Sequence, residues 1–558
     1  MNFKLRSLVA ATLAGSMLMG FGTSAMADST DDILNALIAK GILTEEEGAL
    51  LQKGRTGEKE AAAAKKSKTP VVKEKDGAFA LESADGANSV QLTGRMHFDY
   101  RNSDINNLGS TGAIDSSTDV DSKTMADQFE LRRARIGVKG KIAKDFKYEV
   151  VANLPGVATI DVAYLDFARY EQAQLRFGKF KQPIGLEQLT SSNNIDFMER
   201  SFVDQFVPAK KMGVMLNGSP TSGLTYAGSV YQPNDTEQDM SSDKASYAGR
   251  VTYNFGEAFG NKDVIAHFGL SGFDSDYALQ PATTGNTSST SDGKTRASLF
   301  SIRSGGRGLG NMYRAQIGGE TITPTCTAVP STGTTTCTVT GDYHLGNSNT
   351  AQVESKAYGL EGILAYGPFK VQGEYLNNDI EGRYRDSTVT SDVNAYYAEA
   401  LWLVTGEKYA DFYKKGAFGG ITPKNSLDLE TGKGGWGALE VGFRFDQVEA
   451  NSSIVNGTSL TNSRVQGSTA NKNSGSLDTC SSSTSLGSKD CGKGGAKSYT
   501  AGLKWILNPN VLFKLNYTHT KFDQAFAPID IGATRTVAQG TNTIDSEDLV
   551  MLRGQFAF

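Results

Sequence analysis

The last residues of the chain carry the pattern that most restricts its fold. Two sets of side chains alternate up to the C-terminus: Val550, Leu552, Gly554, Phe556 and Phe558 against Met551, Arg553, Gln555 and Ala557. Such alternation, ending on an aromatic residue, is typical of the last strand of a membrane β-barrel, which faces lipid on one side and the lumen on the other. A soluble edge strand can alternate in the same way, so both alternatives stay open at this point.

The N-terminus indicates export. Lys4 and Arg6 form a basic region, residues 8–22 are apolar, and Ala25-Met26-Ala27 fits a signal-peptidase site. The apolar stretch is too short for a spanning helix, and no other stretch approaches the ~20 apolar residues that one needs. We therefore predict a signal peptide at 1–27 and a barrel in the cell outer membrane, with a secreted soluble protein as the alternative.

The composition agrees with a barrel and excludes some partners. The chain has 62 glycines and a mean hydropathy of −0.34, as expected where only alternate residues face lipid. The net charge of −5 becomes −7 once Lys4 and Arg6 leave with the signal peptide. This balance predicts no nucleic-acid partner.

The reactive residue types are sparse and scattered. The four cysteines are predicted to form two loop disulfides in an exported protein, Cys326 with Cys337 and Cys480 with Cys491. The four histidines, His97, His267, His344 and His519, fall in no nucleophile or metal motif. We therefore predict no catalytic residues, no metal site and no cofactor.

The segment between the signal peptide and the barrel differs from the rest of the chain. Residues 28–54 have helical periodicity, and 55–76 are rich in alanine and lysine. We predict a periplasmic helical leader and linker over 28–76, acting as a tether or as a small oligomerising coil, with the barrel over 77–558.

Residues 77–558 are predicted to form an all-β, antiparallel transmembrane barrel of about sixteen strands. Single-chain bacterial barrels have an even number of strands, as this one would. The predicted strands are 89–101, 128–140, 145–154, 160–170, 173–180, 211–218, 224–232, 245–255, 263–273, 353–366, 369–379, 393–404, 436–449, 498–507, 511–521 and 547–558.

The connections and the tryptophans support this order of strands. With a periplasmic N-terminus, the predicted outward loops are mostly long and the inward turns mostly short, except for an inward segment at 405–435. Trp402, Trp436 and Trp505 all fall near predicted periplasmic strand ends, where an aromatic girdle belongs.

Several segments, taken in order, resemble the phosphate-selective porins O and P of Gram-negative outer membranes. They are 37–47 (LIAKGILTEEE), 129–137 (FELRRARIG), 177–187 (FGKFKQPIGLE), 196–201 (DFMERS), 405–407 (TGE), 416–425 (GAFGGITPKN), 508–511 (NPNV) with 516–517 (NY), and 553–558 (RGQFAF). The resemblance implies a sixteen-stranded barrel, usually a homotrimer, that passes anions along a line of arginines and lysines.

An anion filter needs cations at a constriction, and the first candidates lie on two strands. The alternation within 128–140 changes phase at Arg132-Arg133. A bulge there would turn both side chains to the lumen, whereas without it one would face lipid headgroups. Arg95, on the polar face of 89–101, is a further lumen candidate.

Two loops supply the other candidates. Loop 274–352 has a basic stretch without acids that includes Arg303 and Arg307; the resemblance implies an inward fold and anion binding, and contact with lipopolysaccharide phosphates is the alternative. Gly305 stands where the family has a second arginine. The resemblance also implies that loop 181–210 folds inward and narrows the pore. In this loop, Arg200 matches the family motif.

These features lead to one main function and two alternatives. We predict a passive, anion-selective porin for phosphate or related small anions, in contact with outer-membrane lipid and lipopolysaccharide. A weakly selective general porin is one alternative, which the acidic loop 102–127 favours. A surface structural or adhesive barrel is the other.

Overall fold

The computed structural model describes the barrel and only isolated residues before it. The described residues are Lys40, Thr44, Glu46, 69–75, 78–108, 128–233, 245–279, 294–308, 311–321, 324–328, 335–339, 351–384, 387–428, 434–455, 464–466, 493–526 and 543–558. The predicted signal peptide, most of the leader and the second cysteine pair lie outside them. Residues Val72–Glu82 and Gly86–Phe558 form one compact unit.

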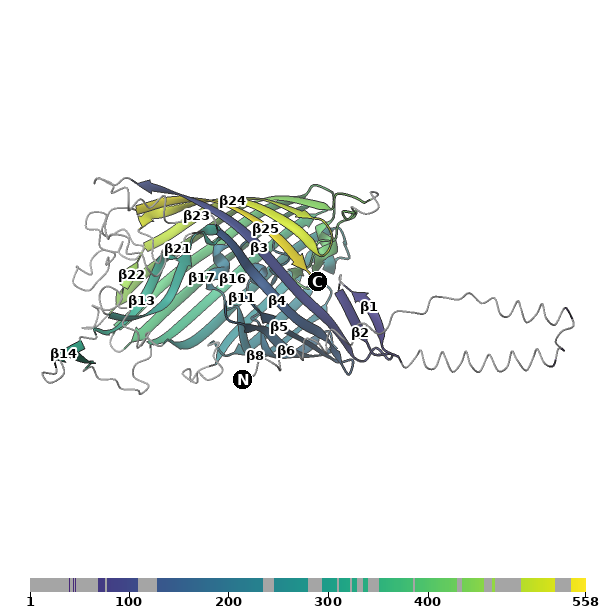
Figure 1. Cartoon of the computed structure of the whole chain (residues 1–558), viewed down its shortest axis with the longest axis horizontal. Helices are drawn as coiled ribbons and strands as arrows, with labels where there is room; N and C mark the ends of the chain where they lie inside the picture. The colour runs from purple at the N-terminus through teal and green to yellow at the C-terminus, as the bar shows by residue number, and fades with distance from the viewer. Residues whose placement is uncertain are drawn as a thin grey trace. The chain divides into compact units, whose positions relative to one another are not determined.

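Sixteen antiparallel strands close into a barrel, as predicted (Figure 1). Each pairs with the next, and the last pairs with the first, β25 with β3. The strands are β3 (Ser89–Leu108), β4 (Gln128–Ile142), β5 (Phe146–Asn153), β6 (Thr159–Tyr170), β7 (Ala173–Lys181), β8 (Lys210–Thr221), β9 (Leu224–Tyr231), β10 (Ser246–Asn254), β11 (Val264–Leu279), β16 (Ala351–Tyr366), β17 (Phe369–Tyr384), β18 (Ser387–Leu403), β21 (Ala438–Val455), β23 (Lys493–Ile506), β24 (Val511–Phe526) and β25 (Thr543–Ala557).

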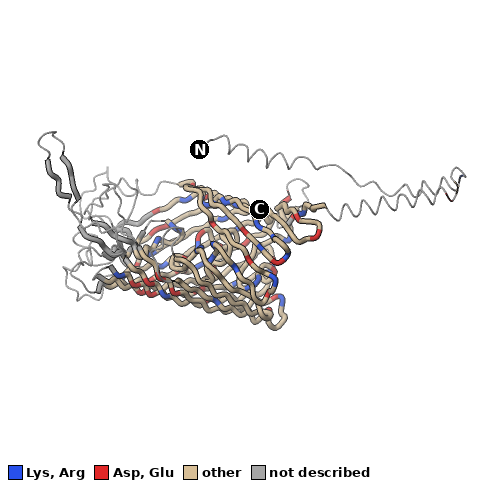
Figure 2. The backbone as a smooth tube through the Cα atoms, turned by 90° about the horizontal axis from the view of Figure 1, so that it is seen from below, with Lys and Arg blue, Asp and Glu red and all other residues tan. Residues whose placement is uncertain are grey.

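The predicted alternation along the strands is confirmed. On β25, Val550, Leu552 and Phe556 are exposed on the outer face, whereas Met551 and Arg553 are buried inside. Charged residues accordingly recur along the barrel wall in Figure 2. Closure gives every barrel strand two neighbours to bond with, which an outer face in lipid requires because no water is available there.

The predicted bulge is also present. The register between β3 and β4 passes from His97 opposite Arg133 to Phe98 opposite Leu131, so Arg132 is the extra residue. A bulge lets two consecutive side chains point to the same side. Both Arg132 and Arg133 therefore contact groups inside the barrel.

The tryptophans lie where they were predicted, at the end of the barrel with the short turns. Trp402 stacks on Phe369 beside the tight turn at Gly367, with ring centroids 6.0 Å apart. The Trp505 indole donates to the Trp436 carbonyl oxygen at 2.7 Å. Such aromatic side chains suit the membrane–water boundary.

Several smaller elements accompany the barrel. β1 (Val71–Lys75), inside the predicted linker, and β2 (Ala78–Glu82) pair with each other, and β2 pairs with β3. β12 (Lys294–Arg303), β13 (Asn311–Thr321) and β22 (Arg464–Gln466) form a separate sheet.

The first cysteine pair lies on a small hairpin of β14 (Pro324–Ala328) and β15 (Thr335–Val339). Cys326 lies opposite Cys337 in its register, and the disulfide itself stays a prediction. Within the described residues no helix has the length and apolarity to cross a membrane.

Candidate functional site

The connection between β7 and β8, residues 182–209, folds into the barrel and is called the inner loop here. It contains α5 (Leu186–Leu189) and η1 (Phe202–Phe206). Its apolar side chains are almost fully buried: Ile184, Leu186, Ile195, Phe197, Met198 and Phe202. Burial of this size inside the barrel fixes the loop as a permanent constriction rather than a mobile cover.

Charged wall residues bind the backbone of the inner loop. The Glu374 carboxylate accepts from the backbone amides of Leu186 and Glu187, at 2.7 Å each. From β24, Lys514 donates to the Ile195 and Phe197 carbonyls at 2.5 and 3.1 Å. These contacts satisfy buried backbone groups that no strand partner reaches. The loop is thus attached to β17 and β24.

Buried ion pairs also attach the inner loop to β17 and β21. Lys370 pairs with Asp196 at 2.8 Å, and Arg444 pairs with Glu187 at 3.2 Å. Buried charges are stable only when they are paired and hydrogen-bonded. The carboxylates of Asp196 and Glu187 are therefore neutralised by the ion pairs that hold the loop. They contribute little negative charge to the open lumen.

Glu199 is the most heavily paired carboxylate of the inner loop. It accepts from Arg101 at 2.7 Å, from Arg132 at 2.9 Å and from Arg553 at 3.2 Å. Arg553 also makes two 2.7 Å bonds to Asp99. Burial by itself would raise the pKa of Glu199, but Arg132 and Arg553 hold that pKa well below its ordinary value. Glu199 is therefore ionised and joins β3, β4 and β25 through one loop residue.

The long inward segment between β18 and β21, predicted at 405–435 as the exception among the turns, also enters the barrel over its described residues. It carries η4 (Tyr409–Phe412), β19 (Tyr413–Lys414) and β20 (Ala417–Phe418). The Tyr409 hydroxyl donates to Glu440 at 2.9 Å, and Arg250 donates to the Gly416 carbonyl at 2.7 Å. This segment narrows the periplasmic end of the lumen.

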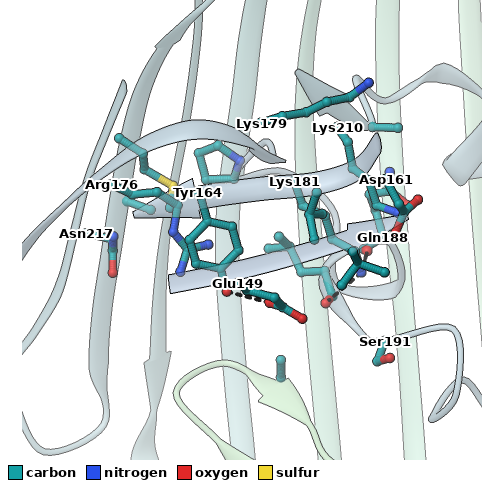
Figure 3. A pocket seen from close by; sticks show the side chains of 18 of the residues that line it. Glu149, Asp161, Tyr164, Arg176, Lys179, Lys181, Gln188, Ser191, Lys210 and Asn217 are labelled. Atoms are coloured by element: carbon teal, nitrogen blue, oxygen red, sulfur yellow. Dashed lines mark hydrogen bonds and ion pairs between the residues drawn. The ribbon is translucent and has the colours of Figure 1, made fainter. Parts of the chain in front are cut away.

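The open part of the lumen lies on the other side of the inner loop, against β3–β10. It is a cavity of about 890 Å³ (Figure 3). Basic side chains outnumber acidic ones around it: Arg95, Arg133, Arg135, Arg176, Lys179, Lys181, Arg200, Lys210, Arg250 and Lys415, against Glu149, Asp161, Glu171 and Asp204. We call it the basic cavity.

Two arginines of the basic cavity have no acidic partner. Arg95 donates to the Ser192 hydroxyl at 2.9 Å and approaches that of Ser191 at 3.4 Å. Arg133 contacts the His97 ring at 3.4 Å. Among the described residues, neither guanidinium forms an ion pair, so their charge remains available to a solute.

Other cations of the cavity are partly neutralised or bound by backbone. Arg135 lies opposite Arg95 in register and pairs with Asp161 at 2.9 Å; Lys210 contacts the same carboxylate. Lys181 donates to three carbonyls, including that of Gln188 at 2.6 Å. One acid shared by two cations leaves this side of the lumen positive.

Comparison with known proteins identifies the family. The model of the phosphate-selective porins O and P matches residues 90–293 and 337–528. The chain belongs to this family. It is 24% identical to Porin O of Pseudomonas aeruginosa over 471 residues, which cover 81% of this chain and 87% of that protein.

Solved structures of similar fold are outer-membrane barrels. OmpT of Vibrio cholerae matches with a TM-score of 0.44 and 9% identity, covering 85% of this chain and 98% of that one. An anion-selective porin from Comamonas acidovorans matches with a TM-score of 0.41 and 10% identity, covering 84% and 100%. By its family, the present chain is an anion-selective porin of the outer membrane.

The predicted site residues of this porin fall into two groups. Arg95, Arg133 and Arg200 line the basic cavity. Arg303 and Arg307 line a second cavity of about 220 Å³ together with Arg101. Arg132 lines neither cavity, and its guanidinium binds Glu199 of the inner loop instead.

The inward position of Arg303 and Arg307 agrees with the predicted inward fold of their loop. Gln205 of the inner loop accepts from the Arg303 backbone amide at 2.9 Å, and Arg101 donates to the Gly306 carbonyl at 2.8 Å. One terminal nitrogen of Arg307, Nη1, is buried without a hydrogen-bond partner among the described residues, so one of its donors is unsatisfied.

The structure explains why this porin has glycine at position 305. A Cβ atom there would lie 2.0 Å from the Ser498 hydroxyl and 2.7 Å from that of Thr520. Gly305 and Arg307 belong to η2 (Gly305–Arg307), which packs on β23 and β24. No side chain fits at 305, so the neighbouring cation comes from Arg307 instead.

Sequence reasoning missed several basic residues that line the two cavities, among them Arg101, Arg135, Lys181 and Lys210. A signal existed for Arg135, because it follows Arg133 at a spacing of two after the bulge and so shares its face. Lys181 and Lys210 sit at the ends of the inner loop, where alternation gives no orientation. Within the described residues, no three histidine, cysteine or acidic side chains gather as metal ligands.

Proposed function

We propose that this porin passes phosphate or related small anions along the basic cavity, by passive diffusion and without a covalent step. The observation that carries this proposal is the segregation of charge around the inner loop. The carboxylates at the loop's attachment are paired and buried, whereas Arg95 and Arg133 face the open lumen without an acidic partner. Low-dielectric walls strengthen the attraction of such cations for an anion.

A route through the lumen follows from the two groups of cations. Arg303 and Arg307 would receive the anion, and Arg95, Arg133 and Arg200 would bind it in the basic cavity. The hydroxyls of Ser191 and Ser192 would replace part of its hydration shell. Several weak sites in series suit conduction better than one tight site, because the anion must also leave.

The zero-current potential across a planar bilayer under a KCl gradient, followed by phosphate titration of the chloride conductance, tests this function. We expect an anion-selective potential and block of chloride current by phosphate. Anion selectivity without block would indicate a general anion porin. A channel that stays closed while its loops support attachment would indicate an adhesive barrel.

We also propose the organisation predicted from the sequence: signal peptide at 1–27, helical leader and linker at 28–76, barrel at 77–558, and assembly as a homotrimer in contact with lipid and lipopolysaccharide. The mass of the protein purified from outer membranes tests the cleavage. We expect a chain that begins at Asp28, and a mass that retains residues 1–27 would contradict it.

A further inference from the structure

Two lysines lie side by side on the outer face of the barrel. Lys497 of β23 and Lys521 of β24 are opposite one another in register, and we call them the lysine pair (Figure 1). The residues next to them, Ser498 and Thr520, are each only 1% exposed and point inward, so the alternation of a strand turns both lysines outward. Like charges directly opposite one another on one face of a sheet repel. The lysine pair is therefore unfavourable unless an anion lies beside it.

The lysine pair lies at the outward boundary of the hydrocarbon core. Nine residues, counting both ends, lead from Phe513 at the periplasmic end of β24 to Lys521, and the count from Trp505 back to Lys497 is the same. A tilted strand needs about 9–11 residues to cross the core. Tyr517, just below the pair on β24, is 48% exposed on the outer face, as is typical of the membrane–water boundary.

The ammonium groups of the lysine pair have no fixed partner. Among the described residues, neither lysine forms a hydrogen bond or an ion pair. Asp523, two residues farther along β24, attracts both lysines but forms no ion pair with them in the part of the chain that the structure describes. Outward cations on other strands differ, because Lys356 pairs with Glu354 on β16 and Arg383 pairs with Glu381 on β17.

The polar neighbours of the lysine pair are bound to other groups of the protein. Gln447 of β21 lies opposite Lys497, and its amide donates to Glu449 at 2.5 Å. On the membrane side of the pair, the His519 ring contacts the Asp548 carboxylate at 2.8 Å. These carboxylates are thus engaged elsewhere. The lysine pair is the part of this surface that retains positive charge and donors for a ligand from the membrane.

We propose that the lysine pair binds a phosphate group of lipopolysaccharide in the outer leaflet, at a lipid site separate from the anion route through the lumen. Lipid A, the acylated part of this glycolipid, carries its phosphates on sugars directly above the acyl chains, which is the level of the lysine pair. Each ammonium group can donate several hydrogen bonds to phosphate oxygens. The proposal rests on the contact with lipopolysaccharide put forward under Proposed function and names the residues that make it.

Binding of lipid A to the delipidated porin in detergent, measured by native mass spectrometry, tests this site. The double variant Lys497→Gln with Lys521→Gln removes the lysine pair. The matched control, Lys356→Gln with Arg383→Gln, removes two outward cations that already have acidic partners. Each lysine near a membrane surface contributes to the attraction of anionic lipid, so we expect the first variant to bind bisphosphorylated lipid A at least roughly tenfold more weakly. The control should bind it like the wild type.

Dephosphorylated lipid A separates phosphate recognition from acyl-chain contact. We expect the wild type to bind it as weakly as the lysine variant binds the bisphosphorylated form. Equal binding of the two lipids by the wild type, or equal weakening in the lysine variant and the control, would overturn the proposal. Displacement of lipid A by inorganic phosphate at matching concentration would also overturn it, because the site would then take free phosphate rather than a lipid.

A charge-preserving variant guards against a change of fold. Lys497→Arg with Lys521→Arg keeps both charges and should keep lipid A binding, and its loss would contradict the proposal. Phosphate block of the chloride conductance, measured in parallel, should be normal in every variant because the lysine pair lies outside the lumen. Failure of the lipid site and failure of the anion function are therefore distinguishable.

Discussion

Replacing Arg95 and Arg133 by glutamine is expected to remove most of the phosphate block of this porin. These two guanidiniums face the basic cavity without an acidic partner. A hydrogen bond to a charged group contributes about 1.5–3 kcal/mol. Each substitution should therefore raise the phosphate concentration for half-block roughly tenfold or more. Titration of the chloride conductance of Arg95→Gln, Arg133→Gln and the double variant measures the effect.

A matched control comes from another arginine of the same cavity. Arg176 pairs with Asp166 through two bonds of 2.6 and 2.8 Å. The double variant Arg176→Gln with Asp166→Asn removes this pair and leaves the net charge unchanged. We expect nearly normal phosphate block from it. Equal loss of block in the control and in the Arg95 and Arg133 variants would show that lumen geometry, rather than free positive charge, sets the preference.

Replacing Glu199 by glutamine is expected to destabilise the barrel more than any other single change in the inner loop. The substitution leaves Arg101, Arg132 and Arg553 without their common carboxylate in a buried site. Breaking a buried charge pair on one side costs about 3–5 kcal/mol. We expect a lower temperature of heat modification on gels and a larger, noisier conductance as the loop loosens.

The pH dependence of this variant has a definite sign. Because the pKa of Glu199 is held well below its ordinary value, its stabilisation is present at neutral pH and is lost as pH falls through the folded-state pKa. The difference between the wild type and Glu199→Gln should thus be constant near neutrality and shrink in strong acid. Glu130→Gln is the control, because Glu130 is 3.6 Å from Arg101 but partly exposed. An equal loss of stability in both variants would remove the special role of Glu199.

The barrel itself could be predicted from the sequence because lipid imposes a simple rule. Every second residue of a spanning strand must be apolar, and this rule located all sixteen strands. It also revealed the bulge at Arg132, where the phase of the alternation changes. Above the membrane the rule no longer applies, so the extensions of β3 to Leu108 and of β11 to Leu279 were missed.

The attachment of the inner loop could not be predicted in this way. Lys514 binds the carbonyl of Ile195, and Arg553 binds that of Met198 at 2.6 Å, although these pairs lie far apart in the sequence. Every residue has a backbone carbonyl, so the sequence pattern does not show which carbonyl a lysine or arginine will bind. The same holds for Gly305, whose need for glycine arises from the hydroxyls of Ser498 and Thr520 on distant strands.

The segregation of charge around the inner loop also bears on how such channels diverge. The side chains that hold the loop lie mainly on β17, β21, β24 and β25, with Arg101 on β3 and Arg132 on β4, whereas those that meet the solute lie mainly on β3–β8. Substitutions on β3–β8 at positions other than Arg101 and Arg132 can therefore alter which solute is preferred without loosening the constriction. Relatives with the same scaffold are free to acquire new nutrient specificities by drift on one half of the wall, while the other half stays under selection for folding.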